Sequence, residues 1–424
     1  MYYIDEVQIQ NVRNLKDQNI NFEKGVNVII GENGTGKTTL LKVIALSLCQ
    51  KYMASALCVE SKEIFKRAKN KKSISKIKFT PDKKWPEPLV CETNFDDIER
   101  IEKKFSSISS DRLSRQDANL ELLYSVCGVF GAQRNTSIEL LQEDVAAEIA
   151  PMEFFKPLFG APQNFLNPGW AFHLFRGFYS KNPEVQTSFE KIQKKLISFL
   201  KLPAGSVFEL TKERTNPKMK HSYGLSVVSK KGRVNFYDLS DGQKNIILMV
   251  FGIFYGVCLQ TPRIINPLRA NGVVLIDEIE NHLHPSMERE ILSFLRRCFP
   301  SLQFVVTTHS PNVVIGYEDS NVISLHKKGN NLVSSTSFKP VRENETISVP
   351  EILSSNRLFD VPLFSDSTEQ KIHKYEKLKA KSPESRTEEE KNELNDLAKF
   401  FFKNELLQSV SLENYQRGFS DKDY

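Results

Sequence analysis

A segment near the start of the sequence has the residue types and the spacing that bind nucleotide phosphates. It runs from Gly31 to Thr39 and reads G-E-N-G-T-G-K-T-T. Glycines allow backbone N–H groups to wrap the phosphates, a lysine in this place reaches the β- and γ-phosphates, and the hydroxyl after it binds Mg²⁺. The predicted ligands of a nucleotide are Gly31, Asn33, Gly34, Gly36, Lys37, Thr38 and Thr39. Thr38 is also a predicted ligand of Mg²⁺.

A second group of candidate residues follows an apolar run far along the chain. Residues 272–276 read GVVLI, and Asp277 and Glu278 come directly after them. A carboxylate at the end of a buried strand can hold the water shell of Mg²⁺, as in other phosphoryl-transfer sites. Asp277 is therefore a predicted metal ligand, and Glu278 is the predicted catalytic residue that polarises the attacking water. Glu280 is either a further acid of the site or the start of the next helix.

The elements around these residues have the order that a phosphate-binding loop requires. Residues 26–30 (VNVII) form an apolar run typical of a central strand covered on both faces, and a helix is predicted over 40–49. Further along, 246–259 predicts a buried helix, 286–298 another helix and 303–310 a strand. Strand, glycine loop and helix therefore follow one another without a gap.

The segment Leu239–Lys244, which reads L-S-D-G-Q-K, resembles the signature motif of ABC-type ATPases, with Asp where many members have Gly. The resemblance implies that Ser240 and Gly242 contact the γ-phosphate of ATP bound to the opposite subunit, and that Gln243 belongs to the same contact. A helix start suits this role because its N–H groups attract anions. The implied cofactors are ATP and Mg²⁺, and the implied reaction is hydrolysis of ATP to ADP and phosphate.

Two further segments are similar to parts of the same family. Residues 281–285 (NHLHP) resemble the dimer-contacting D-loop, in which His284 is expected to pack or cap rather than catalyse. Residues 307–310 (TTHS) contain His309, which resembles the catalytic switch histidine that meets the γ-phosphate. The family also has a metal-binding glutamine after a strand, and Gln133 is the candidate. Arg134 beside it is expected to contact either phosphate or a neighbouring subunit.

The branch of the family follows from what lies between and after these motifs. Only about 190 residues separate them, without the heptad repeats that SMC and repair ATPases insert. The chain after His309 is too short for the Toprim domain of the overcoming-lysogenization-defect nucleases. The D-E-x-E-x-x-L-H-P element, the GAQR turn and LFDVPLF (358–364) instead resemble the compact ATPases of bacterial anti-phage systems such as Septu, PARIS and the retron-associated ones.

The expected fold class is α/β: a P-loop NTPase core with an ABC-type antiparallel N-terminal lobe, a mixed α+β lid insertion and a helical C-terminal segment. We expect the N-terminal lobe over 1–50, the insertion over 51–237, the C-terminal ATPase lobe over 238–340 and the helical segment over 341–424. Within the insertion, a charged helix is predicted over 96–124, an apolar element over 121–130, a helix over 185–202 and a hairpin over 212–233.

The C-terminal segment predicts a capped amphipathic helix. Thr387 followed by Glu390 is a capping-box pattern, and the helix is expected to run to about Gln408. Its apolar stripe comprises Leu394, Leu397 and Phe401, flanked by Phe400 and Phe402. The stripe packs either on the chain's own core or on another subunit or effector.

Composition limits the classes of protein that fit. The chain has 424 residues, 40% hydrophobic and 26% charged, which is typical of a folded globular protein. The six cysteines contain no C-x-x-C pair, so a reducing cytoplasmic location is expected without a disulfide scaffold or zinc ribbon. The start of the chain lacks a signal-peptide pattern. The longest apolar run, 246–259, is shorter than the roughly 20 residues of a membrane span, so no membrane partner is expected.

Two functions compete. In the first, the protein is the ATP-using sensor and scaffold subunit of an anti-phage complex that holds a separately encoded toxic effector, a nuclease from a neighbouring gene. In the second, it is a RecF-like DNA-repair ATPase that clamps DNA. A transporter subunit is a poorer reading because nothing resembles a transmembrane-coupling arrangement. The expected partner in either case includes a second copy of the chain, as an ATP-sandwich homodimer or a higher oligomer.

Two basic stretches could bind nucleic acid in either function. Residues 62–84 hold ten Lys or Arg against two acids, and residues 212–233 hold seven against one. The overall charge of +6 is too mild to indicate a partner by itself. The alternative is that each stretch is a solvated face.

Overall fold

The structure is a computed structural model of the chain. It describes residues 2–49, 73–81, 89–95, 102–107, 126–132, 158, 182–213, 222–260, 266–328, 332–338, 341–342, 345–346, 365–382 and 385–403. Two compact units are present, Met1–Asn344 and Glu345–Tyr424, and each is described by itself. Two-residue strands, β15 (Val341–Arg342) and β16 (Glu345–Thr346), lie on either side of this boundary in the sequence.

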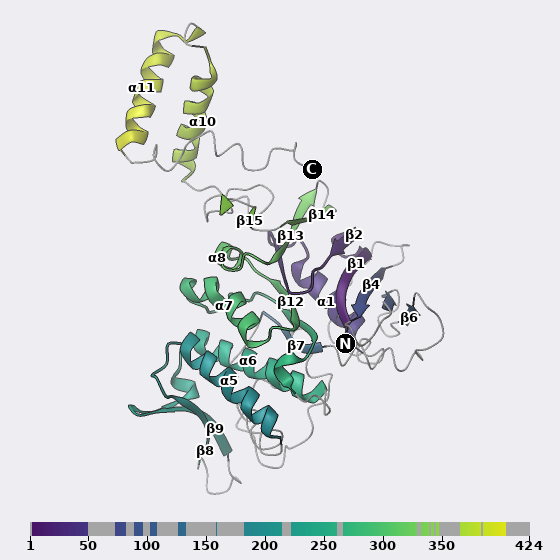
Figure 1. Cartoon of the computed structure of the whole chain (residues 1–424). Coiled ribbons are helices and arrows are strands. Elements are labelled where there is room, and N and C mark those ends of the chain that lie inside the picture. Colours follow the sequence, from purple (N-terminus) through teal and green to yellow (C-terminus); the bar gives the residue numbers. More distant parts are fainter. Residues whose placement is uncertain are drawn as a thin grey trace. The chain divides into compact units, whose positions relative to one another are not determined.

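The centre of the first unit is a six-stranded sheet in the order β14-β13-β3-β12-β11-β7 (Figure 1). Its strands are β3 (Val26–Gly31), β7 (Val126–Phe130), β11 (Gly272–Ile276), β12 (Leu302–Thr307), β13 (Asn321–Lys328) and β14 (Leu332–Phe338). All neighbours pair in parallel except β13 and β14. The register aligns Ile276, Val306 and Val28, so the carboxyl ends of three central strands meet at one edge.

Burial explains the apolar runs that predicted these strands. Every residue of β3, β7, β11 and β12 is buried. Parallel strands that are covered on both faces need apolar side chains at consecutive positions rather than at alternate ones. The α/β fold with a P-loop core is confirmed.

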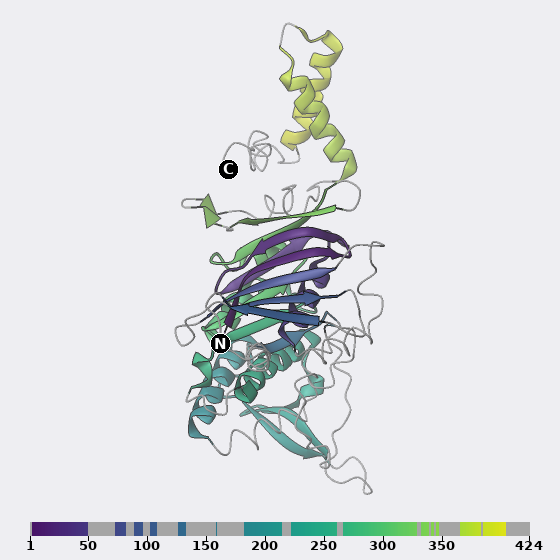
Figure 2. The same cartoon turned by 90° about the vertical axis from the view of Figure 1, so that its right-hand side faces the viewer.

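A second, five-stranded sheet is antiparallel throughout, in the order β2-β1-β4-β5-β6 (Figure 2). Its strands are β1 (Tyr2–Val12), β2 (Leu15–Asn21), β4 (Ile74–Pro81), β5 (Leu89–Asn94) and β6 (Glu102–Ser107). This is the expected ABC-type antiparallel lobe. The lobe is larger than expected, because β4, β5 and β6 come from the range 51–237 that was assigned to the insertion. Strand β7, which also lies in that range, belongs to the central sheet.

The predicted charged helix over 96–124 is wrong at 102–107. These residues form β6, which pairs antiparallel with β5. The six residues, EKKFSS, have little strand preference of their own. Strand preference depends strongly on the partner strand, and here the ladder with β5 overrides the local composition.

Helices cover the central sheet. They are α1 (Lys37–Leu48), α5 (Pro183–Phe199), α6 (Asp241–Gln260), α7 (Pro285–Cys298) and α8 (Pro311–Ile315), with short 3-10 turns at Phe236–Asp238 and Pro267–Arg269. The helix predicted over 185–202 corresponds to α5, and the one over 286–298 to α7. A small antiparallel sheet, β10-β9-β8, contains the hairpin predicted over 212–233; its strands are β8 (Val207–Glu213), β9 (Ser222–Ser229) and β10 (Gly232–Asn235).

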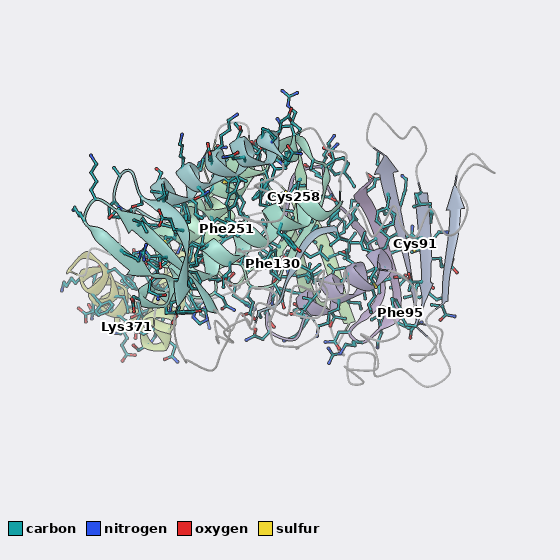
Figure 3. The ribbon with its side chains drawn as sticks, turned by 90° about the horizontal axis from the view of Figure 1, so that it is seen from below. Cys91, Phe95, Phe130, Phe251, Cys258 and Lys371 are labelled. Atoms are coloured by element: carbon teal, nitrogen blue, oxygen red, sulfur yellow. The ribbon has the colours of Figure 1, made fainter. Side chains whose placement is uncertain are left out.

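Aromatic side chains hold α5 and α6 together. The ring of Phe189 lies 5.1 Å from that of Phe251 and 5.0 Å from that of Phe254, and α6 in turn packs against β7. Figure 3 labels Phe251 in α6 and Phe130 in β7. Such ring pairs add to the gain from burial. None of the described helices is long and apolar enough to cross a membrane.

The second unit contains a helical hairpin of α10 (Asp366–Ala380) and α11 (Glu388–Lys403). The predicted capping box is present: the N–H of Thr387 donates to Glu390 Oε2 and the N–H of Glu390 to Thr387 Oγ1, each at 3.2 Å. From the predicted stripe, Phe401 is 3% exposed and its ring lies 5.4 Å from that of Tyr375 in α10. Lys371, labelled in Figure 3, lies over the ring of Phe400. The described part of α11 ends at 403, so the predicted end at Gln408 lies outside it.

A buried glutamine joins the central sheet to the five-stranded antiparallel sheet. Gln303 of β12 donates from Nε2 to the carbonyl oxygens of Ile4 at 2.8 Å and Glu23 at 2.9 Å. Its Oε1 accepts the N–H of Ile4 at 2.9 Å. The side chain of Gln303 thus forms hydrogen bonds with the N–H and the carbonyl group of Ile4, next to the register shift of β1 between Ile4 and Glu6. Buried polar groups need such partners, so Gln303 fixes the antiparallel lobe on the core.

We expect Gln303→Leu to lower the free energy of unfolding by about 1–3 kcal/mol, because it leaves buried polar groups of Ile4 without partners. Gln8→Leu is the matched control, since Gln8 is exposed on β1 and bonds Glu6 at the surface. It should change stability by about 0.5 kcal/mol or less. Urea denaturation followed by circular dichroism measures both. Equal losses in the two variants would contradict the role given to Gln303.

Candidate nucleotide site

The predicted phosphate loop joins β3 to α1 at the carboxyl edge of the central sheet. Gly36 precedes α1 with φ of 102°, a conformation that favours glycine, and no side chain caps the helix there. The N–H groups of the first turn thus point to the place where a phosphate would bind. Lys37 Nζ donates to the carbonyl oxygens of Gly31 at 2.7 Å and Glu32 at 3.0 Å, so its amine lies over the loop.

Burial changes the chemistry of Lys37. The side chain is 7% exposed, and desolvation lowers the pKa of its amine from 10.5 to about 8. The negative charges of Asp277, Glu278 and Glu280 oppose this shift without cancelling it. A cation that is poorly solvated and lacks a direct carboxylate partner gains most when an anion arrives.

A carboxylate and two hydroxyl groups meet beside the loop. Thr38 Oγ1 donates to Asp277 Oδ2 at 2.9 Å, and Thr307 Oγ1 donates to Asp277 Oδ1 at 2.6 Å. Asp277 is 3% exposed and its N–H donates to the carbonyl oxygen of Phe130. Thr38 and Asp277, two of the three predicted metal ligands, are thus in contact although they are far apart in the sequence. Thr307 was not predicted as part of this group.

These oxygen atoms are of the type that Mg²⁺ prefers. Among the residues that the structure describes, no group of three or more His, Cys, Asp or Glu side chains could hold a metal ion. This donor set fits an Mg²⁺ ion that takes a hydroxyl and a carboxylate from the protein and its remaining ligands from phosphates and water.

Glu278 stands in a tight turn after β11. Its φ is 48°, which is unusual for a residue with a side chain, and its N–H donates to Thr307 Oγ1 at 2.8 Å. The amide of Asn281 donates to Glu278 Oε2 at 2.9 Å. The predicted base is therefore positioned by its backbone and by a neighbouring amide.

Glu280 belongs to the site and not to the next helix. Helix α7 begins at Pro285, and Glu280 Oε1 accepts the N–H of His309 at 2.5 Å. Its Oε2 is buried and finds no hydrogen-bond partner in the part of the chain that the structure describes. The acid therefore fixes the backbone of the predicted switch histidine. Burial and the charge of Lys37 lower the pKa of His309.

The signature segment forms the start of α6. Ser240 Oγ accepts the N–H of Gln243 at 3.3 Å, and Gln243 Oε1 accepts the N–H of Ser240 at 3.2 Å. Gln243 Nε2 also donates to the carbonyl oxygen of Leu200 at 3.4 Å, so its side chain serves the cap and the contact with α5. Ser240 is exposed, whereas Gly242 is buried.

Of the remaining candidate residues, the structure describes His284 but not Gln133 or Arg134. His284 caps α7, since its Nδ1 accepts the N–H of Ser286 at 3.3 Å, as the non-catalytic reading expected. Gln133 and Arg134 lie outside the described residues, which at this point of the chain end with Ala132.

Sequence reasoning missed a contact from the turn between β1 and β2. Asn14 Nδ2 donates to the carbonyl oxygen of Gly34 at 2.5 Å, and Arg13 reaches Thr39 Oγ1 at 3.5 Å. Arg13 has φ of 51°. The sequence N-V-R-N between two strands indicates a turn. It does not indicate that this turn contacts the phosphate loop 20 residues further along the chain.

The basic stretches are only partly described, and their described parts include paired charges. Within 62–84, Lys78 of β4 pairs with Asp5 at 2.9 Å. Within 212–233, Arg233 of β10 pairs with Glu209 at 3.5 Å. Binding of nucleic acid by these stretches stays a prediction.

Two family models match the sequence. One, described as "AAA domain, putative AbiEii toxin, Type IV TA system", matches residues 154–315. The other, described as "AAA domain", matches residues 6–202. Each match covers less than half of the chain, and both agree with the P-loop core and the antiparallel lobe described above.

The chain is also similar to individual proteins and solved structures. The Septu protein PtuA of Bacillus thuringiensis is 24% identical over 335 residues, which cover 77% of this chain and 76% of that protein. The Retron Ec83 probable ATPase of Escherichia coli is 39% identical over 100 residues, 23% of this chain and 18% of that protein. The aligned part thus spans less than a fifth of the retron ATPase. Among solved structures, the SMC head bound to the C-winged helix domain of ScpA gives a TM-score of 0.49 at 17% identity, covering 80% and 98% of the two chains.

The lowered pKa of Lys37 predicts that nucleotide affinity falls as the pH rises above about 8. Below this pH the amine is charged in the free protein. Above it, binding must take up a proton, because the phosphates favour the charged form, and the dissociation constant should rise by up to about tenfold per pH unit. Titration calorimetry with a non-hydrolysable ATP analogue between pH 7 and 9.5, in buffers of different ionisation enthalpy, measures both effects.

Lys37→Arg is the control for this experiment. A guanidinium stays charged over the whole range, so this variant should bind more weakly but with little dependence on pH. If the dissociation constant of the unaltered protein stays constant up to pH 9.5, the pKa of the Lys37 amine is not lowered.

Proposed function

We propose that this protein binds ATP with Mg²⁺ and hydrolyses it slowly. The contact between Thr38 and Asp277 carries the proposal, because it places the hydroxyl of the phosphate loop and the acid of the central sheet where one Mg²⁺ ion would need both. Mg²⁺ would neutralise phosphate charge at this place. The phosphates would lie on the backbone of the loop and on Lys37. The residues of the loop given this role are Gly31, Asn33, Gly34, Gly36 and Thr39.

In this proposal the chemistry falls to two residues. Glu278 polarises the water that attacks the γ-phosphate, since its carboxylate stands at the end of β11 one residue after the metal ligand. His309 contacts the γ-phosphate from the end of β12, with its backbone held by Glu280. Asn312 Nδ2 and Ser310 Oγ both donate to Glu288 Oε2, at 3.0 and 2.6 Å, so α7 anchors the segment that follows the histidine.

A second copy of the chain would complete the site. Ser240 is exposed at the start of α6, where free N–H groups attract an anion, and it belongs to a segment whose other contacts are structural. We propose that Ser240, Gly242 and the backbone of Gln243 contact the nucleotide of the partner subunit. The resulting assembly is an ATP-sandwich homodimer or a higher oligomer of such dimers.

The biological role proposed is that of an ATP-dependent sensor and scaffold in anti-phage defence. The similarity to the Septu protein extends over three quarters of both chains, and the retron ATPase bears the name of another such system. In this role the ATP state sets whether a separately encoded toxic effector, a nuclease, is held or released. The alternative, a RecF-like clamp on DNA, has less support because the similarity to the Septu protein extends over 77% of this chain.

The composite site is tested with Glu278→Gln, which retains the shape of the side chain but removes the base. ATP should bind and remain, and the protein should accumulate as a nucleotide-dependent dimer or larger assembly in light scattering with Mg-ATP. Ser240→Arg should prevent this assembly while ATP still binds, because a long side chain at this exposed position would block the surface that meets the partner. A mass of Glu278→Gln that does not depend on nucleotide would contradict the sandwich.

The scaffold role is tested by purification from the native gene neighbourhood. We expect the product of a neighbouring gene to co-purify, and the isolated chain to cut neither DNA nor RNA. Ending the chain at residue 364 removes the α10–α11 hairpin as a whole, and should weaken this assembly more than it weakens ATP binding. Nuclease activity of the isolated chain that persists in Lys37→Ala through further purification would overturn the proposal. Lys37→Ala itself should abolish ATP hydrolysis.

A further inference from the structure

Two asparagines connect the start of α6 to the carboxylate of Glu278. Asn281 lies in the turn between β11 and α7. Its Nδ2 donates both to Glu278 Oε2, at 2.9 Å, and to the carbonyl oxygen of Ala132, at 2.8 Å. Both protons of this amide are therefore used, one on the proposed base and one on the chain that leaves β7.

The second asparagine belongs to α6. Asn245 is 2% exposed, and its Nδ2 donates to the carbonyl oxygen of Asn281 at 2.8 Å. Its Oδ1 is also buried and has no hydrogen-bond partner among the described residues. An unpaired buried acceptor lowers stability, so an apolar residue of the same size would suit the fold better. The presence of Asn245 thus needs a reason other than stability.

The turn that carries Asn281 has little freedom to move by itself. Glu278 and His282 have positive φ values, 48° and 63°, and the N–H of Asn281 donates to the carbonyl oxygen of Glu278 at 3.1 Å. On the side of α6, a Cβ atom at Gly242 would stand 2.4 Å from the carbonyl oxygen of His282. Only glycine permits this approach, so the signature segment and the turn are in direct backbone contact.

We propose that Asn281 is a positioning residue for ATP hydrolysis. Its side-chain amide holds the carboxylate of Glu278, and Asn245 ties Asn281 to α6, so the position of the signature helix sets the position of the base in the same subunit. The inference rests on the proposed function of Glu278. It gives a physical route by which the nucleotide of the partner subunit, on contact with Ser240 and Gly242, affects hydrolysis at this subunit's own site.

The first test separates this role from stability. Asn245→Leu removes the donor to Asn281 together with the unpaired acceptor. We expect kcat for ATP to fall by about 10- to 100-fold, as misplacement of a catalytic group by about 1 Å does, with nucleotide affinity within twofold. Tm should change little, because removal of the unpaired acceptor offsets the donor that the carbonyl oxygen of Asn281 loses. Asn182→Ala, which removes the cap of α5, is the matched control and should lower Tm without changing kcat. A kcat of Asn245→Leu equal to that of the unaltered protein would overturn the tie to α6.

The second test asks whether Asn281 acts through Glu278. Asn281→Ala should lower kcat by a similar factor with unchanged nucleotide affinity. In single-turnover measurements on Glu278→Gln, adding Asn281→Ala should leave the residual rate unchanged, since the group that it positions is already lost. If both backgrounds lose the same factor, Asn281 acts independently of Glu278 and the inference is wrong.

Failure of the proposed function would give a different pattern. If Glu278→Gln hydrolyses ATP as fast as the unaltered protein, Glu278 is not the base, and the proposed function fails at that point. If Glu278→Gln is inactive while Asn281→Ala is fully active, the proposed function stands and only the positioning role is overturned.

Discussion

The hydrogen bonds to the buried carboxylate of Asp277 are the interaction on which the site depends. A buried charge is costly unless it is paired or hydrogen-bonded, and Asp277 receives hydroxyl donors from Thr38 of α1 and Thr307 of β12. These donors reach it because parallel pairing aligns the ends of β3, β12 and β11 at one edge. The sheet register therefore decides whether the phosphate loop and the acid meet. A shift of that register would separate Asp277 from Thr38 and Thr307, which are close in space but distant in the sequence.

The motif residues could be predicted from the sequence because each is local. The glycine loop, the acids after 272–276 and the helix start at Ser240 are short patterns whose geometry follows from a strand end or a helix end. The central strands could be predicted for the same reason, since burial on both faces leaves consecutive apolar residues. The capping box of Thr387 is another local pattern.

The long-range contacts could not be predicted in this way. Nothing in the residues 102–107 indicates pairing with β5, and the predicted charged helix there was wrong for that reason. The hydrogen bond from Thr307 to Asp277 depends on which strand lies beside β11. The apolar pattern of the strands would be the same for any order of strands in the sheet. Asn281 lies in the segment that resembles the D-loop, but the sequence gave it no contact with Glu278. Asn245 gave no signal, because a lone asparagine on a helix is ordinary.

The contact between the start of α6 and the turn after β11 would connect the proposed base to the partner subunit. The proposed base follows β11, the signature segment begins α6, and Gly242 allows the backbone of α6 to touch the turn that follows β11. In an assembly of two chains, the signature segment of each would face the nucleotide of the other. A shift of α6 on contact with that nucleotide would therefore reach Glu278 through Asn245 and Asn281, over hydrogen bonds of 2.8 and 2.9 Å. Because these hydrogen bonds link the three side chains directly, hydrolysis in one subunit would respond to nucleotide occupancy in its partner.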